Sequence, residues 1–282
     1  MKSYLVAMYF MVLSISSFAQ TISNEVYNKI NISCVYRLTY RQDSLDTKTQ
    51  TETMQLLIAN DLSEFRSKNL FKRDSAQKEI ARRDNAASMS NMEISASVNS
   101  MLQLPNAKFS YIIYKIPSKK QFLTYDNIMN VNYKYEEHYN AFKWIISQEK
   151  SNILGYTCQK ATTSFAGRTY EAWFTKEIPV SDGPYKFSGL PGLIVKVYDI
   201  KKDYVFELTG LSQTQQNHTI RLPNNLVIPT TKSEFFSASR ISQETAVDRA
   251  SQYGVSFTNP DQVRAKIRER LKRQNNPIEL KY

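Results

Sequence analysis

Histidine and cysteine are scarce in this sequence, and their scarcity narrows the chemistry that the chain can carry. Each occurs twice among 282 residues, and the two histidines, His138 and His218, stand far apart. Structural zinc sites need cysteines and histidines at short, regular spacings, which are absent here. No Walker, GxGxxG, HExxH or GxSxG motif occurs either. We therefore predict no metal, no cofactor and no catalytic residue, since Glu171 and Glu177 alone make only a weak carboxylate pair.

Long apolar runs are missing from residue 20 onward, so we expect no transmembrane segment in the mature chain. Before that point an apolar stretch over residues 4–13 follows a lysine, and Ser17-Phe18-Ala19 ends it with small residues. A membrane span needs about 20 apolar residues, whereas a secretory signal peptide has this shorter layout. We predict a signal peptide over residues 1–19 and a single domain over residues 20–282. The cleaved product is then soluble, in the periplasm or secreted. The alternative is a retained membrane anchor.

Aromatic and basic residues, by contrast, are plentiful. The chain has 18 tyrosines and 14 phenylalanines, and aromatic residues are typical of strands. Its formal net charge is +11, with the densest basic runs at residues 66–83 and 264–273. Both runs alternate with acidic or polar residues, and no aromatic-basic nucleic-acid motif accompanies them. We interpret the charge as a solvated basic surface and expect no nucleic-acid partner.

Alternation of apolar and polar residues recurs along most of the chain and predicts a β-rich fold. The predicted strands cover residues 32–40, 51–59, 63–68, 109–116, 121–125, 131–137, 142–147, 156–165, 169–174, 193–198 and 204–211. They follow one another at hairpin spacing without the helices of a βαβ fold between them. The predicted class is mainly β with added α: a curved, mostly antiparallel sheet or a half-open barrel.

Two regions have helical rather than strand character. Residues 70–104 are rich in polar residues, alanine and methionine, and we expect a partly helical excursion from the sheet. Two helices are predicted within residues 240–275. The first begins at Ser242 and stops near Gly254, and the second opens at Asn259, because asparagine caps helices and the following proline suits a first helical position.

The chain's most informative stretch is GPYKFSGLPGLIVKVYD, at residues 183–199. Pro191-Gly192 is a turn pair in which proline sets a negative φ and glycine takes the positive φ of a type II turn. Leu193 and the alternate residues after it read as a strand with one buried face. We predict a tight, rigid bend that leads directly into a core strand.

The same stretch resembles a known family. Residues 189–194 match the signature hexapeptide of the GLPGLI family of exported proteins from Gram-negative bacteria, and the resemblance extends over about residues 142–199. It rests on Gly155, Tyr156, Cys158, Gly167, Arg168, Gly183, Pro184, Gly189, Pro191, Gly192, Leu193 and Ile194. The resemblance implies export and a β-rich domain, and no established reaction. Arg168 stands at a predicted hairpin tip without an evident structural need.

Bulky apolar residues around the bend suggest a place for an apolar ligand. We predict that Leu190 lines the rim of a groove bordered by Tyr170 or Trp173, with Phe187 nearby, while Leu193 enters the core. The alternative is that these side chains are all core residues of a sheet covered on both sides.

Cys34 and Cys158 both fall in predicted strands. In an exported protein an even cysteine count suggests a disulfide, which across so long a loop would contribute about 4 kcal/mol on the chain-entropy model. Such a bond requires neighbouring strands. Two buried thiols are the equally weighted alternative.

The function that these features favour is an exported binding protein. Its ligand would be a hydrophobic small molecule, an acyl chain or a peptide, in the service of an outer-membrane protein system. The second hypothesis is an accessory subunit that docks through its basic C-terminal helix without a ligand, and the third is an enzyme of unknown chemistry. Titratable groups that converge in a pocket would favour the enzyme.

Overall fold

Strands and helices succeed one another much as the sequence pattern predicts. The computed structural model describes residues 28–85, 90–138, 142–213, 219–223 and 226–281, so the predicted signal peptide and His218 lie outside the described residues. The elements in chain order are β1 Asn28–Lys29, β2 Ile32–Tyr40, β3 Gln50–Ile58, β4 Ser63–Ser67, α1 Lys68–Asn85, α2 Asn91–Leu102, β5 Ile112–Ile116, the 3₁₀ turn η1 Pro117–Lys119, β6 Gln121–Ile128, β7 Val131–His138, β8 Ile145–Ile153, β9 Tyr156–Phe165, β10 Arg168–Thr175, β11 Leu193–Asp199, β12 Tyr204–Gln213, β13 Thr219–Ile220, β14 Ile228–Pro229, α3 Lys232–Glu244, α4 Ala246–Gln252 and α5 Pro260–Lys272.

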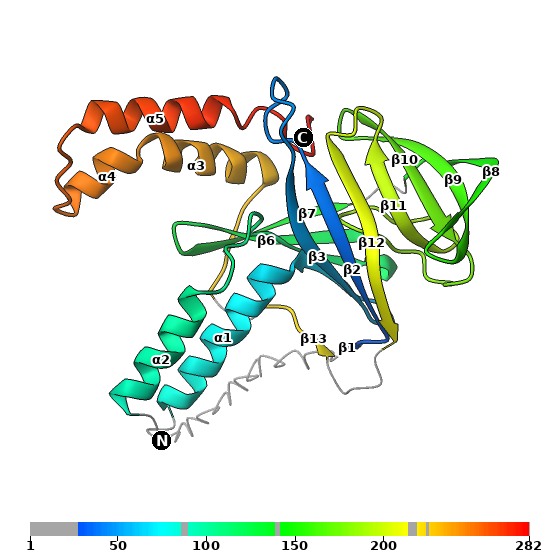
Figure 1. The fold of residues 1–282 in the computed structure, drawn as a ribbon, viewed down its shortest axis with the longest axis horizontal. Helices are drawn as coiled ribbons and strands as arrows, with labels where there is room; N and C mark the ends of the chain where they lie inside the picture. Colours follow the sequence, from blue (N-terminus) through cyan, green and yellow to red (C-terminus); the bar gives the residue numbers. More distant parts are fainter. Residues whose placement is uncertain (1–27, 86–89, 139–141, 214–218, 224–225, 282) are drawn as a thin grey trace, which may run out of the picture.

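A 12-stranded sheet with the order β14-β7-β6-β5-β4-β3-β2-β12-β11-β10-β9-β8 forms the body of the protein. Every neighbouring pair is antiparallel except β14 and β7, and β1 pairs with β13 outside this sheet. The strands turn steeply along the sheet, so that β6 and β7 run across Figure 1 while β2 and β12 run down it. The predicted β-rich class is confirmed, in its open-sheet form.

The main hydrophobic core lies against one face of this sheet. Strand β2 shows why, because Cys34, Tyr36, Leu38 and Tyr40 are buried at alternate positions. The segment between β10 and β11 joins this core through Ile178, Tyr185, Phe187 and Leu190. The Tyr36 hydroxyl donates to the carbonyl of Ile194, at the start of β11, at 2.7 Å. The chain therefore fills the concave side of its own sheet with its own residues.

The helical excursion predicted for residues 70–104 is confirmed as α1 and α2. The two helices pair with each other and extend away from the sheet (Figure 1). Ser90 caps α2 by accepting from the backbone N–H of Glu93, and the Glu93 carboxylate accepts in return from the backbone N–H of Ser90. This reciprocal capping box fixes the start of α2.

The C-terminal helices begin earlier than predicted. Helix α3 starts at Lys232 because Thr231 and Glu234 form a capping box, so the predicted start at Ser242 is wrong and Ser242 lies in the last turns of α3. The second predicted start is confirmed, since the side chain of Asn259 accepts from the N–H of Gln262 and α5 begins at Pro260.

The bend at Pro191-Gly192 differs in type from the prediction. The N–H of Gly192 donates to the carbonyl of Leu190 at 2.8 Å, which closes a three-residue turn around Pro191 instead of a type II turn. Such γ-turns suit the φ of proline and are common where strands begin. The predicted positive φ at Gly192 is confirmed, at 150°.

The two cysteines are free, buried thiols. Cys34 lies on β2 and Cys158 on β9, and the strands β12, β11 and β10 separate them. The expectation of neighbouring strands, and with it the predicted disulfide, is therefore wrong. Burial raises the pKa of the Cys34 thiol to about 12, so this thiol stays protonated at neutral pH.

We predict that iodoacetamide labels neither cysteine in the folded protein and both cysteines after unfolding in urea without any reductant. The reason is that a buried, protonated thiol is a poor nucleophile. Intact-mass spectrometry counts the adducts. Labelling that requires prior reduction would contradict the structure.

Candidate functional site

The residues predicted to border an apolar groove are core residues instead. Tyr170, Phe187 and Leu190 are fully or almost fully buried, and Trp173 is 9% exposed. The rings of Tyr170 and Phe187 meet edge to face with centroids 4.7 Å apart. The predicted rim position of Leu190 is therefore wrong. Its segment folds under the sheet, which a strand-and-turn pattern does not reveal.

The signature residues are likewise positioned by packing. A methyl group on Gly192 would lie 2.0 Å from the carbonyl oxygen of Thr175, and one on Gly183 would lie 2.8 Å from the side chain of Ile194. Leu193 and Ile194 are buried at the start of β11, as predicted for Leu193. Gly192 therefore allows the backbone of the hexapeptide to pack closely against the end of β10.

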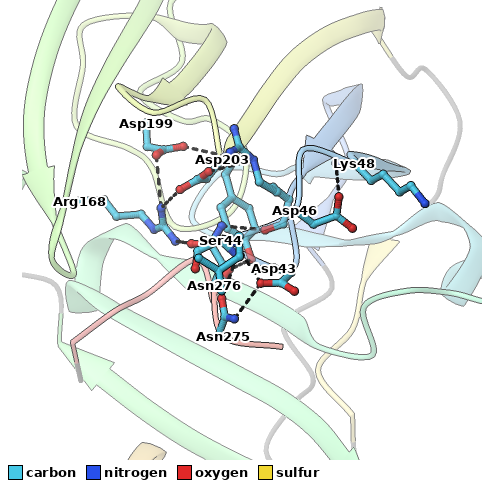
Figure 2. A network of polar contacts seen from close by, with 12 residues as sticks. Asp43, Ser44, Asp46, Lys48, Arg168, Asp199, Asp203, Asn275 and Asn276 are labelled. Atoms are coloured by element: carbon cyan, nitrogen blue, oxygen red, sulfur yellow. Dashed lines mark hydrogen bonds and ion pairs between the residues drawn. The ribbon is translucent and has the colours of Figure 1, made fainter. Parts of the chain in front are cut away.

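Arg168 has a structural role that its place in the sequence did not indicate (Figure 2). Its guanidinium lies between Asp199 and Asp203, with contacts of 3.3 and 3.0 Å, and donates to the side-chain oxygen of Asn276 at 2.6 Å. It also donates to the carbonyls of Pro277 at 2.7 Å and Ile278 at 3.1 Å. The arginine thus holds the C-terminal segment after α5 against the sheet.

Further buried ion pairs fasten the same region. The Glu279 carboxylate accepts from Lys186 at 2.6 Å and also contacts Lys232 and Tyr185. Burial alone would raise the pKa of Glu279, but the ammonium groups of Lys186 and Lys232 outweigh it and hold that pKa below its usual value. On β5, Lys115 donates to Asp182 and to the carbonyl of Gly183, both at 2.5 Å. These charges tie residues 182–187 and the C-terminal segment in place.

A cavity of about 1230 Å³ lies on the other face of the sheet. It is walled by α1, by strands β3 to β7 and by residues near β13. Its lining combines three acidic and three basic side chains (Glu64, Asp74, Asp126, Arg66, Lys78, Arg221), five side-chain amides (Gln55, Gln77, Asn127, Asn130, Asn132) and three aromatic rings (Phe71, Tyr114, Tyr125). None of the lining residues belongs to the predicted groove or to the signature.

Arg66 and the two carboxylates beside it form the cavity floor. Arg66 on β4 contacts the Glu64 carboxylate at 3.5 Å and the Asp74 carboxylate of α1, and its guanidinium lies over the Phe71 ring, 5.4 Å from the centroid. Burial raises the pKa of Glu64, although Arg66 and the Tyr114 hydroxyl oppose this shift. Tyr114 is cross-strand partner of Glu64 and donates to the carbonyl of Arg221 at 3.1 Å.

Within the described residues, two buried polar atoms beneath this floor have no hydrogen-bond partner. They are the side-chain oxygen of Gln55 and the Nε of Arg66. Gln55 on β3 and Arg66 on β4 are direct cross-strand partners, so their side chains stand next to each other on one face. Both atoms are buried from solvent, so neither faces the open space of the cavity.

Sequence reasoning missed this site because its residues occupy the polar positions of alternating strands. Such positions ordinarily face solvent, and the cavity forms only because α1 and residues near β13 stand beside them as further walls. The available signal was the charge within β4, where Glu64 and Arg66 flank a buried Phe65. His138, at the end of β7, is exposed and outside the cavity. Within the described residues, no group of three or more histidine, cysteine or acidic side chains could hold a metal ion.

Comparisons with known proteins address the family and the fold. A family model described as "Protein of unknown function (Porph_ging)" matches residues 165–196, which run from the end of β9 into β11. No curated protein matches. A solved structure titled "Structure of PNGF-II in C2 space group" is similar with a TM-score of 0.51 at 14% identity, over 76% of this chain and 33% of that one. A second, in space group P21, has a TM-score of 0.50 at 14% identity, over 76% and 34%.

These similarities establish an arrangement of strands and helices and nothing about chemistry. The chain spans about a third of the length of the PNGF-II structures, and at this identity the likeness concerns the fold alone. Across the ranges that the structure describes, no helix is both long enough and apolar enough to cross a membrane.

Proposed function

We propose that this chain is an exported binding protein of the GLPGLI type and that the cavity between α1 and the sheet receives its ligand. The observation that carries the proposal is the cavity itself, about 1230 Å³ in volume and lined by six charged side chains and five side-chain amides. The signal-peptide pattern of residues 1–19 supports export, and the Porph_ging match supports the family.

The ligand we propose is polar, in contrast to the apolar ligand expected from the sequence. An acyl chain in this cavity would cover charged and amide side chains without offering them hydrogen bonds, which is unfavourable. The apolar surfaces expected to receive such a chain are occupied by the protein's own core. Binding specificity in pockets comes from a few well-placed polar groups, and here these groups line the cavity.

An accessory role has one observation in its favour. Helices α3, α4 and α5 extend from the sheet as an arm (Figure 1), and Ile241, Tyr253 and Val255 are exposed on it. Such a surface suits docking to a partner such as an outer-membrane protein. A subunit that only docks would have no ligand in its cavity, so one experiment separates the two functions.

That experiment is an NMR titration of the isotope-labelled mature chain with a library of neutral polar fragments. We expect amide shift changes concentrated at β3, β4, β6 and α1. Ala81 on α1 lines the cavity, so Ala81→Trp should fill it and abolish these changes. Ala265→Trp is the matched control, because Ala265 is equally exposed but lies on α5 outside the cavity.

Shift changes that gather on the α3–α5 arm, that persist in Ala81→Trp, or that are absent throughout would exclude the cavity as the binding site.

A further inference from the structure

We infer that the arm formed by α3, α4 and α5 binds the surface of an anionic lipid bilayer, with the loop between α4 and α5 inserted among the lipid headgroups. This inference goes beyond the binding function proposed for the cavity and does not depend on it. It rests on three features of the described residues: basic side chains of α5 without acidic partners, exposed apolar side chains in the loop, and the position of that loop at the end of the arm.

Helix α5 carries more basic charge than its surroundings neutralise. Six of residues 264–273 are basic and one is acidic. Arg264 pairs with Asp248 and Asp261, at 2.6 and 2.8 Å. Arg273 pairs with Glu269 at 2.8 Å, so every acidic side chain of α4 and α5 already has a partner. Within the described ranges, no acidic side chain pairs with the four basic residues that remain, all of them exposed: Lys266, Arg268, Arg270 and Lys272.

The packing of α5 leaves these cations on its outer faces. Val263, Ile267 and Leu271 are partly buried, and α5 contacts both α3 and α4. Residues four apart lie on one side of a helix, so these three form the side that packs within the arm. The basic side chains occupy the remaining circumference. The arm therefore presents a cationic helix to whatever approaches it.

The loop between α4 and α5 exposes apolar side chains. Tyr253 is 85% exposed and Val255 is 49% exposed, while Phe257 is partly buried. The loop lies at the end of the arm that is farther from the sheet (Figure 1). A tyrosine at a membrane interface buries its apolar ring and keeps its hydroxyl group in water. Because the loop protrudes, it can enter a bilayer surface without a collision between the sheet and the lipid.

Basic charge beside an apolar tip is the combination that holds peripheral proteins on anionic membranes. The phosphate groups of the lipids attract the cations, and burial of the apolar side chains adds a contribution that salt does not screen. Each lysine or arginine near such a surface strengthens binding about fivefold. Four cations without acidic partners and two exposed apolar residues are together sufficient for a reversible peripheral contact.

A protein partner fits this surface less well. A stable protein–protein interface buries about 800 Å² on each side, and its centre is apolar and depleted of charge. Here the apolar part is confined to the tip of an arm, and the helix beside it is densely charged. A bilayer adapts to a protruding tip and needs no complementary shape.

The test is co-sedimentation of the mature chain with vesicles. One set contains phosphatidylcholine alone, and in the other set one lipid in three is phosphatidylglycerol. We expect binding to the anionic vesicles at about 0.1 M NaCl, much weaker binding at about 1 M NaCl, where the charges are screened, and weaker binding to phosphatidylcholine at either concentration.

Lysine variants test the basic helix. Lys266→Gln combined with Lys272→Gln removes two cations and should weaken binding to the anionic vesicles about 25-fold, about fivefold for each charge. Lys150→Gln combined with Lys176→Gln is the matched control. Both control lysines are exposed, but they lie on β8 and directly after β10, on the other side of the molecule from the arm (Figure 1). The control pair should leave the affinity unchanged.

Apolar variants test the loop. Tyr253→Ser combined with Val255→Ser should weaken binding about tenfold and leave its salt dependence in place. Ile145→Ser combined with Ile200→Ser is the matched control, because these residues are 73% and 64% exposed but lie outside the arm. Ala81→Trp, which fills the cavity, should leave vesicle binding unchanged, so failure of the cavity function and failure of this inference are separate results.

A fluorescent label reports insertion directly. The two native cysteines are buried thiols, so a nitrobenzoxadiazole reagent should label only a cysteine introduced on the surface. With Tyr253→Cys, the emission of the label should rise and shift to shorter wavelength when anionic vesicles are added. With Ile145→Cys it should stay unchanged.

Three outcomes overturn the inference. The first is absence of binding at about 0.1 M NaCl, or equal binding to the two sets of vesicles. The second is that the lysine pair or the loop pair binds as tightly as its matched control, or that the label at Tyr253→Cys does not respond. The third is release of the vesicle-bound protein by polyglutamate at a carboxylate concentration equal to that of phosphatidylglycerol, which would assign the basic helix to an acidic protein partner.

Discussion

Gly192→Ala is expected to lose at least about 4 kcal/mol of unfolding free energy, a large share of the stability of a typical domain. The added methyl group would lie 2.0 Å from the Thr175 carbonyl oxygen and 2.6 Å from its carbon, and both are backbone atoms that no side-chain rotation can move. Gly192 also has a φ of 150°, which L-residues rarely adopt. Strand β11 would have to separate from the end of β10. Urea unfolding followed by circular dichroism measures the loss.

Gly155→Ala is the matched control for this prediction. Gly155 also has a positive φ, of 84°, but an added methyl group there would meet no atom within 4 Å. Gly155→Ala should therefore lose only the unfolding free energy that the unfavourable positive φ costs an alanine, about 1–2 kcal/mol. Equal losses in the two variants would show that the approach of Gly192 to Thr175 does not constrain the fold.

The order of strands was predictable because each strand carries its own local signal. In β2 the buried residues alternate strictly. Helix α5 was predictable for a similar reason, since Asn259 and Pro260 mark its start within four residues of sequence. Where a pattern is local and repeated, one sequence suffices.

The arrangement of the segment between β10 and β11 was not predictable in this way. Its apolar residues, such as Leu190, look the same in sequence whether they line a groove or fill a core. The choice depends on Lys115 of β5, which binds Asp182 and Gly183 from a distant part of the chain. The cavity is a similar case, because its walls combine strands β3 to β7 with α1 and with residues near β13, which are distant in sequence.

Arg168→Met is expected to cost about 3–5 kcal/mol, the loss typical when one partner of a buried ion pair is removed. The substitution keeps the apolar stem but leaves Asp199 and Asp203 buried without their guanidinium, and it removes the donors to Asn276, Pro277 and Ile278. The C-terminal segment should detach as well. Hydrogen exchange should therefore rise at residues 276–281 beyond the general loss of stability.

Arg37→Met provides the comparison, because Arg37 pairs with Glu207 at 3.0 Å on the surface, where its side chain is 58% exposed. Exposed pairs contribute about 0–1 kcal/mol, so the same substitution there should be nearly silent. Arg168→Lys should fall between the two, since lysine restores the charge but cannot reach two aspartates and three oxygens of the C-terminal segment with one planar fork. If Arg168→Met proves as mild as Arg37→Met, or if exchange at residues 276–281 is unchanged, the arginine does not hold the C-terminal segment. Retention of that segment would then have to come from Glu279 and its two lysines.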